Sequence, residues 1–328
     1  IKSSAASDVY KRQSIGYGNG YEVSYMNSGK MTNKGWEFRV DAVPFENRDW
    51  RVGFYFNIAH NENKITEMPD NYTEENYTFN NGEYAYRREE GRPMGSFYGY
   101  RYKGVCQNKD ATYARDADGN VMKDISGNAI VMRNGTATIA PGDALYEDIN
   151  HDGVINQYDI VYLGNSNPRF TGGAGVNVSY KQFKLSAIFY GRYGQDVVNS
   201  TRLNNESMRG IDNQSTAVLR RWRNEGDQTD IPRALYGEGY NTLGSDRFVE
   251  DASYLRLKSL SFNYRLPKKI IQRWGFSNID VYVTGYNLFT WTKYTGQDPE
   301  VKTENTYARD SATTPASIQL VAGFNLSF

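Results

Sequence analysis

Apolar and polar residues alternate with a period of two in several segments of this chain. The last twelve residues, 317–328, place Ile318, Phe324 and Phe328 on one side and small or polar side chains such as Asn325 on the other. Successive side chains of a β-strand point to opposite faces, so this segment predicts a strand with one apolar and one mostly polar face. An edge strand of a soluble sandwich shows such a pattern. So does a strand of an outer-membrane barrel, which is apolar toward lipid and polar toward the lumen.

The same alternation recurs along the chain and predicts an all-β, antiparallel fold. We predict further strands over 36–42, 50–59, 171–180, 183–191, 254–266 and 279–291. Only Lys181 and Gln182 separate two of these segments, which predicts a tight hairpin. The apolar positions change parity near Lys258 and Ser259, which predicts a β-bulge. Residues 97–102 also look like a strand, either paired within 105–165 or part of a β-rich loop.

The connections between these strands are unequal in length. Those near 44–49, 181–182 and 267–278 are short, whereas 60–170, 192–252 and 292–316 are long, polar and rich in Gly, Asn and Asp. Short turns on one side and long loops on the other are typical of an outer-membrane barrel. A soluble domain rarely carries so much loop unless the loop is functional.

Composition narrows the class of protein. The chain has 328 residues with 38 basic and 38 acidic side chains, and a neutral chain argues against a nucleic-acid binder. No segment reaches the ~18 apolar residues of a membrane-spanning helix. The 27 Tyr and 5 Trp favour a membrane interface, where aromatic rings with polar tips collect. A Tyr-rich sugar-binding β-sandwich has a similar composition. The single Cys106 excludes an intrachain disulfide.

Residues 1–13 have a different origin in our interpretation. Ser3 to Gln13 match the translation of a common transposon-based sequencing adapter. We therefore regard residues 1–13 as non-native, exclude them from the fold, and treat 14–328 as the C-terminal part of a longer protein. A natural disordered N-terminus is the alternative.

The sharpest local motif is the run from Asp148 to Asp159. Oxygen-bearing groups occupy positions 1, 3, 5, 7, 9 and 12 of a calcium-type loop, with Gly153 at position 6. The predicted ligands are Asp148, Asn150, Asp152, the Val154 carbonyl, Asn156 and Asp159. The loop ends in Asp where an EF-hand has the longer Glu. An Asx-rich turn that holds no ion is the alternative reading.

Other candidate chemistry is weak, and we expect no enzyme activity and no organic cofactor. His60 and His151 are far apart in sequence, and the acidic pair Glu89–Glu90 has no second feature that would make it a glycosidase site. The glycine run at 16–20 has no strand before it and no helix after it, so it does not form a phosphate loop.

Six segments together resemble the SusC/RagA family of TonB-linked outer-membrane transporters. They are Met31–Phe38, Gly91–Tyr100, Asp148–Asp159, Gly164–Gly173, Arg247–Lys258 and Val283–Tyr294. They follow one another in the order found in the family and span nearly everything after Ser14.

The resemblance implies a 22-stranded transmembrane barrel with an N-terminal plug, of which this chain supplies C-terminal strands and long extracellular loops. It also implies import of oligosaccharides or peptides through the outer membrane of a Gram-negative cell. The implied partners are a SusD-like surface lipoprotein, the TonB complex and outer-membrane lipid, with no nucleic acid. A soluble extracellular carbohydrate-binding β-domain is the alternative function.

Overall fold

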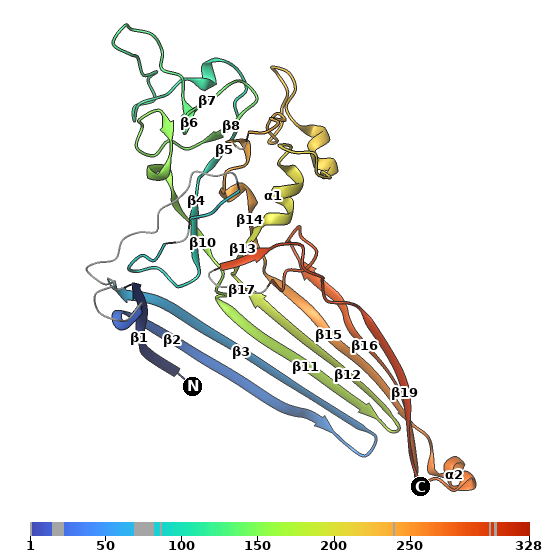
Figure 1. Cartoon of the computed structure of the whole chain (residues 1–328). Helices are drawn as coiled ribbons and strands as arrows, with labels where there is room; N and C mark the ends of the chain where they lie inside the picture. The colour runs from blue at the N-terminus through green and yellow to red at the C-terminus, as the bar shows by residue number, and fades with distance from the viewer. Residues whose placement is uncertain are drawn as a thin grey trace.

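A computed structural model describes residues 2–14, 23–68, 82–85, 87–238, 240–301, 303–304 and 307–328. One large sheet and a body built from three long connections make up the molecule (Figure 1). Among the residues described, no helix combines the length and the apolar character needed to cross a membrane.

The large sheet has eight antiparallel strands in the order β1-β2-β3-β11-β12-β15-β16-β19. They are β1 (Lys2–Ser14), β2 (Val23–Glu46), β3 (Trp50–Glu67), β11 (Phe170–Tyr180), β12 (Phe183–Tyr193), β15 (Tyr254–Arg265), β16 (Asn278–Thr292) and β19 (Gln319–Ser327). The seven predicted strands correspond to β2 through β19 of this sheet. The edge strand β1 beside β2 consists almost entirely of residues 2–13, which the sequence analysis excluded as non-native. Their foreign origin stays a prediction.

Two local features of the sheet follow the sequence. Tyr180 pairs with Phe183, which confirms the tight hairpin at Lys181–Gln182. The register of β15 shifts between Leu257 and Ser259 against both of its neighbours, which confirms the bulge. The turn between β2 and β3 is also built locally, since the side-chain oxygen of Asn47 accepts hydrogen bonds from the backbone amides of Asp49 and Trp50.

Strand lengths differ from the prediction in β2 and β3. β3 continues to Glu67 rather than ending near residue 59, and its final residues pair with Lys30–Lys34 of β2. This extension carries Glu62, Lys64 and other polar side chains, so it has no apolar face that a two-residue period could reveal. The main-chain pairing therefore extends beyond the apolar band of the sheet.

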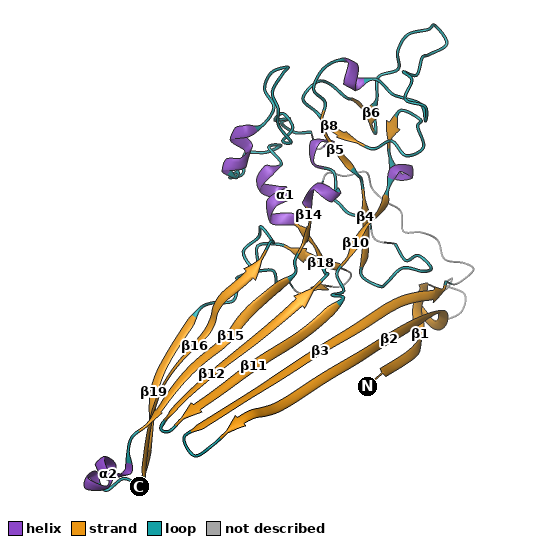
Figure 2. Cartoon of the chain, turned by 180° about the vertical axis from the view of Figure 1, so that it is seen from behind, coloured by secondary structure: helices purple, strands orange, loops and turns teal. Residues whose placement is uncertain are grey.

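The three long connections leave the same end of the sheet and pack together, while the short turns lie at the opposite end (Figures 1 and 2). The short strands of this body are β4 (Ser96–Gly99), β5 (Tyr102–Val105), β6 (Arg133–Asn134), β7 (Ala137–Thr138), β8 (Ala144–Tyr146), β9 (Val154–Ile155), β10 (Val161–Asn165), β13 (Asp196–Asn199), β14 (Val249–Asp251), β17 (Thr303–Glu304) and β18 (Tyr307–Asp310). We call it the loop body. β4 pairs with β10, which lies within 105–165 as in the first predicted alternative. The two strands form a sheet separate from the large one, so residues 97–102 belong to a β-rich connection, as in the second.

Helices are short. They are α1 (Ser200–Glu206), α2 (Lys268–Ile271) and 3₁₀ turns at Asp110–Thr112, Gln157–Asp159, Thr216–Arg220, Tyr240–Thr242, Asp246–Phe248 and Gln272–Trp274. α2 follows Pro267, which ends the preceding extended segment and begins the turn that leads to β16. The sequence analysis predicted that Pro267 ends the strand, but it did not predict the helical turn that follows.

The loop body has its own apolar core. Tyr98, Tyr100, Tyr146 and Ile155 are buried there together with Leu243, which comes from a different connection. A second cluster joins Phe97 of β4 to Val198 of β13 and Phe248. Tyr307 of the third connection packs against this second cluster, so the three connections are folded against one another. Several of the tyrosines that suggested a membrane interface serve this core instead.

Candidate functional site

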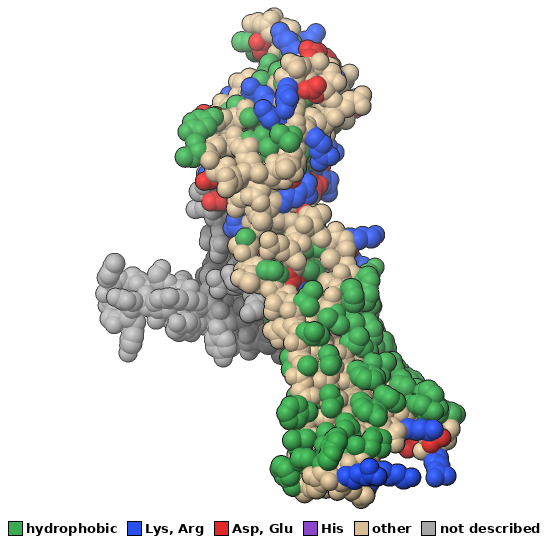
Figure 3. Space-filling model, turned by 90° about the vertical axis from the view of Figure 1, so that its right-hand side faces the viewer, with side chains coloured by type: hydrophobic (Ala, Val, Ile, Leu, Met, Phe, Trp, Pro, Cys, Tyr) green, Lys and Arg blue, Asp and Glu red, His purple; other side chains and the backbone are tan. Residues whose placement is uncertain are grey.

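The two faces of the large sheet have opposite character. Cross-strand pairs such as Phe56–Ala174, Ala174–Phe189 and Leu255–Trp291 place apolar side chains on one face throughout. The intervening positions carry Arg39, Asn57 and other polar residues on the opposite face. Figure 3 shows hydrophobic side chains gathered over the sheet and charged ones over the loop body and the lower end.

The apolar face is open to its surroundings. Phe38 is 52% exposed, Phe262 45% and Phe324 67%, and none of the described residues forms a second sheet against this face. Exposed apolar area of this extent is abnormal for a water-soluble monomer. The face therefore needs an apolar environment outside the chain.

Aromatic residues form two rows across the apolar face. Trp36, His60, Phe170 and Tyr193 make a row near the loop body, with neighbouring ring centroids between 5.2 and 6.4 Å apart. Trp50, Tyr180, Phe183 and Tyr264 make a second row near the short turns, with contacts at 4.3 and 4.6 Å.

The spacing of the two rows has a physical meaning. Phe170 and Tyr180 are ten residues apart along β11. At ~3.3 Å per residue and a strand tilt of ~45°, this separation corresponds to ~23 Å. An apolar band ~25 Å tall between two aromatic girdles is the profile of a barrel wall in an outer membrane.

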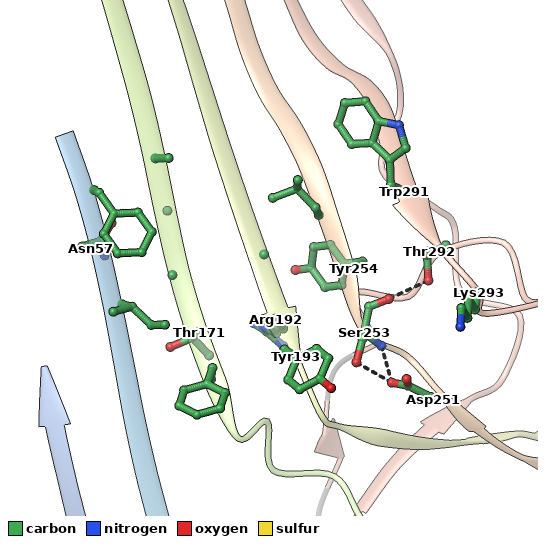
Figure 4. Close-up of a pocket in the computed structure, with 18 residues that line it drawn as sticks. Asn57, Thr171, Arg192, Tyr193, Asp251, Ser253, Tyr254, Trp291, Thr292 and Lys293 are labelled. Atoms are coloured by element: carbon green, nitrogen blue, oxygen red, sulfur yellow. Dashed lines mark hydrogen bonds between the residues drawn. The ribbon is translucent and has the colours of Figure 1, made fainter. Parts of the chain in front are cut away.

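A groove of about 680 Å³ lies in the apolar face beside the aromatic row that is near the loop body. Gly172 and Gly191 are paired across β11 and β12 and leave space between Phe56, Tyr193 and Trp291. Figure 4 shows Tyr193, Ser253 and Asp251 grouped at one end of this groove. Most of its lining side chains belong to the apolar face, and Thr171, Arg192 and Tyr254, at the alternate positions of the same strands, also line it.

The polar face carries a dense group of charges and tyrosines close to the loop body. Arg192 pairs with Tyr254, and Tyr190 pairs with Arg256, across β12 and β15. The Arg192 Nε donates to the Tyr190 hydroxyl at 3.2 Å, and the Arg256 guanidinium carbon lies 5.3 Å from the Tyr254 ring centroid. The Lys258 Nζ is 5.7 Å from the Tyr190 ring centroid. We call these five residues the Arg–Tyr cluster.

Two carboxylates from the connection between β16 and β19 reach this cluster. Arg256 forms ion pairs with Asp298 and with Glu300, the latter at 2.8 Å, and Lys258 pairs with Glu300 at 2.9 Å. Arg256 Nε also donates to the Thr290 hydroxyl at 2.9 Å. This group was missed by the sequence analysis. Alternation alone places Arg256 on the polar face, but nothing in the sequence links it to Asp298.

A second opening, of about 510 Å³, lies nearer the short turns and is lined mainly by polar side chains. Asp41, Arg51, Tyr55 and Lys184 line it on the polar face. Gly175 makes room for Tyr55, because a Cβ at that position would lie 2.1 Å from the tyrosine ring. The polar face is thus hollowed in a region where charged side chains project from it.

The predicted calcium loop folds as one compact turn in the loop body. The Asp148 Oδ2 accepts a hydrogen bond from the Gly153 amide at 2.8 Å, and the Asp152 Oδ1 accepts one from the Val154 amide at 2.8 Å. The Asn150 amide donates to Asp152 at 2.9 Å. Gly153 has a φ of 81°, a conformation that favours glycine at the predicted turn position.

The last predicted ligand lies deeper than the others. Asp159 is fully buried, and its two oxygens accept hydrogen bonds from the amides of Ile149 and Asn156, both at 2.8 Å. Burial raises the pKa of Asp159, and the nearby Asp148 and Asp152 carboxylates act in the same direction. The Val154 carbonyl accepts a hydrogen bond from the side-chain Nδ2 of Asn156 at 3.0 Å.

This arrangement partly fits a hard cation. The side-chain oxygens required for calcium are present in one turn, although backbone amides occupy several of them. Within the described residues, no group of three or more His, Cys, Asp or Glu side chains is arranged to hold a metal ion. Calcium binding at 148–159 stays a prediction.

Comparison with known proteins identifies relatives over nearly the whole chain. The chain is 32% identical over 296 residues to TonB-dependent receptor P3 of Formosa agariphila. The chain is a relative of the TonB-dependent receptors of the SusC/RagA family. It is also 25% identical over 312 residues to TonB-dependent receptor SusC of Bacteroides thetaiotaomicron. These relatives are named as receptors rather than enzymes. No family model matches the chain.

Solved structures agree with the sequence relatives. The RagAB peptide importer in its closed-closed state matches with a TM-score of 0.68 and 25% identity over 100% of this chain and 33% of that one. The RagAB peptide transporter matches with a TM-score of 0.66 and 26% identity over 96% of this chain and 31% of that one. This chain spans 27% of the length of both P3 and SusC.

Proposed function

We propose that this chain is the C-terminal barrel portion of an outer-membrane importer that takes up oligosaccharides, or peptides, with energy from the TonB complex. The single observation that carries the proposal is the continuous apolar face between two aromatic rows, backed by a charged polar face. In this proposal lipid covers the apolar face, the polar face lines the lumen, and the sheet is one wall of a 22-stranded barrel.

The loop body then lies outside the cell and the short turns face the periplasm. A SusD-like surface lipoprotein closes the mouth above the loop body, and a plug fills the lumen beside the polar face. Support comes from the similarity to SusC and to the RagAB peptide importer. Each of those chains is about three to four times longer than the part of it that aligns with this chain. Transport in this mechanism needs no chemistry on the substrate, only binding by loops and lumen and movement of the plug.

Membrane fractionation of cells that express the complete gene tests the location. The protein should sediment with outer membranes and need detergent for extraction, because the apolar face is stable only in hydrocarbon. Recovery in the aqueous fraction would instead support the alternative, a soluble extracellular carbohydrate-binding β-domain. Growth of a deletion strain on single oligosaccharides and on peptide mixtures, with and without the restored gene, tests uptake and its substrate class.

A further inference from the structure

The Arg–Tyr cluster contains more positive than negative charge. Its three cations are Arg192, Arg256 and Lys258, and the carboxylates that reach it are Asp298 and Glu300. Those carboxylates pair with Arg256 and Lys258. Within the described part of the chain, no ion pair joins Arg192 to a carboxylate. Arg192 is half-buried, and its one hydrogen bond there goes to the Tyr190 hydroxyl.

Glu300 acts on Arg192 electrostatically but forms no ion pair with it, and a partly buried cation without an ion-pair partner favours binding of an anion. Desolvation of a guanidinium is unfavourable unless an opposite charge or hydrogen-bond acceptors replace the lost water. The planar guanidinium presents several N–H donors that match a carboxylate in a two-point contact. Arg192 has most of these donors available on the polar face.

Tyr254 supplies a second and independent observation. Its side chain is 5% exposed, and its buried hydroxyl has no hydrogen-bond partner among the described residues. Tyr254 is the direct cross-strand partner of Arg192 on the same face, which brings the two side chains within reach of one ligand. A buried hydroxyl without a partner is rare in folded proteins and indicates a missing acceptor.

The neighbouring strand β11 leaves space beside Arg192. Thr171 pairs with Arg192, and Gly173 pairs with Tyr190, so the position next to Tyr190 has no side chain. The Asn57 side-chain oxygen lies 3.1 Å from where a Cβ of Gly173 would be. Thr171 and Asn57 therefore add a hydroxyl and an amide to the edge of this space.

We infer that Arg192, the Tyr254 hydroxyl and Thr171 form a carboxylate-binding subsite, and that the imported substrate carries a carboxylate. The inference rests on the proposed function, because the subsite lies on the face that would line the lumen. Arg192 makes the two-point contact, and Tyr254 donates its unused hydroxyl to the same group. A uronic acid of an oligosaccharide and the terminal carboxylate of a peptide both have this chemistry.

Titration calorimetry on the purified full-length protein in detergent tests the subsite. The probes are tri-galacturonic acid and its methyl ester, and tri-alanine and its C-terminal amide. We expect at least one acid to bind about tenfold to a hundredfold more tightly than its neutral derivative, as for hydrogen bonds to a charged group. The pair that shows this preference identifies the source of the carboxylate.

Variants assign the preference to these residues. Arg192→Gln should remove it, and Tyr254→Phe, which deletes only the hydroxyl, should reduce it severalfold. Lys184→Gln is the matched control, because Lys184 lies on the same strand and face near the other end and loses the same charge. Equal binding of acid and neutral probes by the parent protein, or an unchanged preference in both Arg192→Gln and Tyr254→Phe, would overturn the inference. Import of a neutral substrate would still uphold the proposed function in that case.

Discussion

Arg256 on β15 forms an ion pair with Asp298, which lies 42 residues further along the chain in the connection to β19. The Arg256 side chain is only 3% exposed, and the pair anchors this connection to the wall of the sheet. Asp298 also accepts hydrogen bonds from the amides of Glu300 and Ala316, both at 2.9 Å. One buried guanidinium therefore positions a loop segment over the polar face.

Removal of this guanidinium should destabilise the protein. Arg256→Met leaves Asp298 without its cation, and breaking a buried ion pair from one side reduces the free energy of unfolding by about 3 kcal/mol. The measurement is the urea midpoint of the protein in lipid or detergent. Arg39→Met is the control, because the Arg39–Asp41 pair on the same sheet is exposed. Equal midpoints for Arg256→Met and the parent would contradict the structural role of the pair.

The two faces of β11 should respond oppositely to a charge. Val176 is on the apolar face and 41% exposed, and the next residue, Asn177, is on the polar face. Val176→Arg should lower the free energy of unfolding in lipid by about 2–4 kcal/mol, because a charge would enter hydrocarbon. Asn177→Arg should have little effect, since it adds a charge to a wet surface. A harmless Val176→Arg would show that this face is in water.

Calcium binding depends on the 148–159 loop if the predicted ligands are correct. Calorimetric titration with calcium should show binding to the parent protein and none to Asp148→Ala. Asp124→Ala is a close control, because the Asp124 carboxylate closes a similar turn by accepting hydrogen bonds from the amides of Ser126 and Asn128. The same calcium uptake by parent and Asp148→Ala would exclude this loop.

Cys106 reports on the integrity of the loop body. It is fully buried, and burial raises the pKa of its thiol to about 11. At pH 8 its thiolate fraction should be about two hundredfold below that of an ordinary cysteine with a pKa near 8.5. Iodoacetamide should therefore label it at least that much more slowly in the native protein than in urea.

The raised pKa of the Cys106 thiol also makes the free energy of unfolding depend on pH. The folded protein holds the thiol proton more tightly than the unfolded chain does. The contribution of the thiol to the free energy of unfolding is therefore complete below about pH 8.5, and it is lost as the pH rises toward the pKa of the thiol in the folded protein. Cys106→Ala should lose that part of the alkaline dependence of the urea midpoint. Rapid labelling of the native protein at pH 8 would contradict burial of the thiol.

Close approach of two backbones in the loop body requires a glycine at position 244. A Cβ there would lie 2.0 Å from the carbonyl oxygen of Glu83, which cannot move independently of the main chain. Gly244→Ala should lower the free energy of unfolding of the loop body by about 2 kcal/mol, as for overpacking at a fixed site. Faster hydrogen exchange of residues 96–100 would show the effect. Gly210→Ala, whose Cβ would make only an ordinary van der Waals contact with the Asp212 Oδ2 at 3.7 Å, should leave exchange unchanged.

The strands of the sheet could be predicted because one face of each had to be apolar. Phe183, Leu185 and Ala187 alternate with polar residues over the length that crosses the apolar band, and a two-residue period makes this visible. The period disappears where both faces are polar, as at Glu62 and Lys64. The end of β3 was therefore predicted too early and the start of β2, which pairs with it, too late.

The loop body and the Arg–Tyr cluster depend on contacts between distant parts of the sequence. Tyr146 is buried against residues of another connection, and its hydroxyl accepts a hydrogen bond from the Leu243 amide at 3.0 Å. Such contacts impose no local period, because each residue packs against a partner about a hundred positions away. The two-residue alternation of the sequence was enough to place Arg192 and Tyr254 on the polar face. Their pairing needed the register of β12 against β15.

β13 and β18 lie side by side in parallel, with Val198 opposite Arg309 and Asn199 opposite Asp310. These strands come from separate connections, one between β12 and β15 and the other between β16 and β19. The two therefore cannot swing independently. We therefore expect any rearrangement at this end of the molecule to displace both connections together.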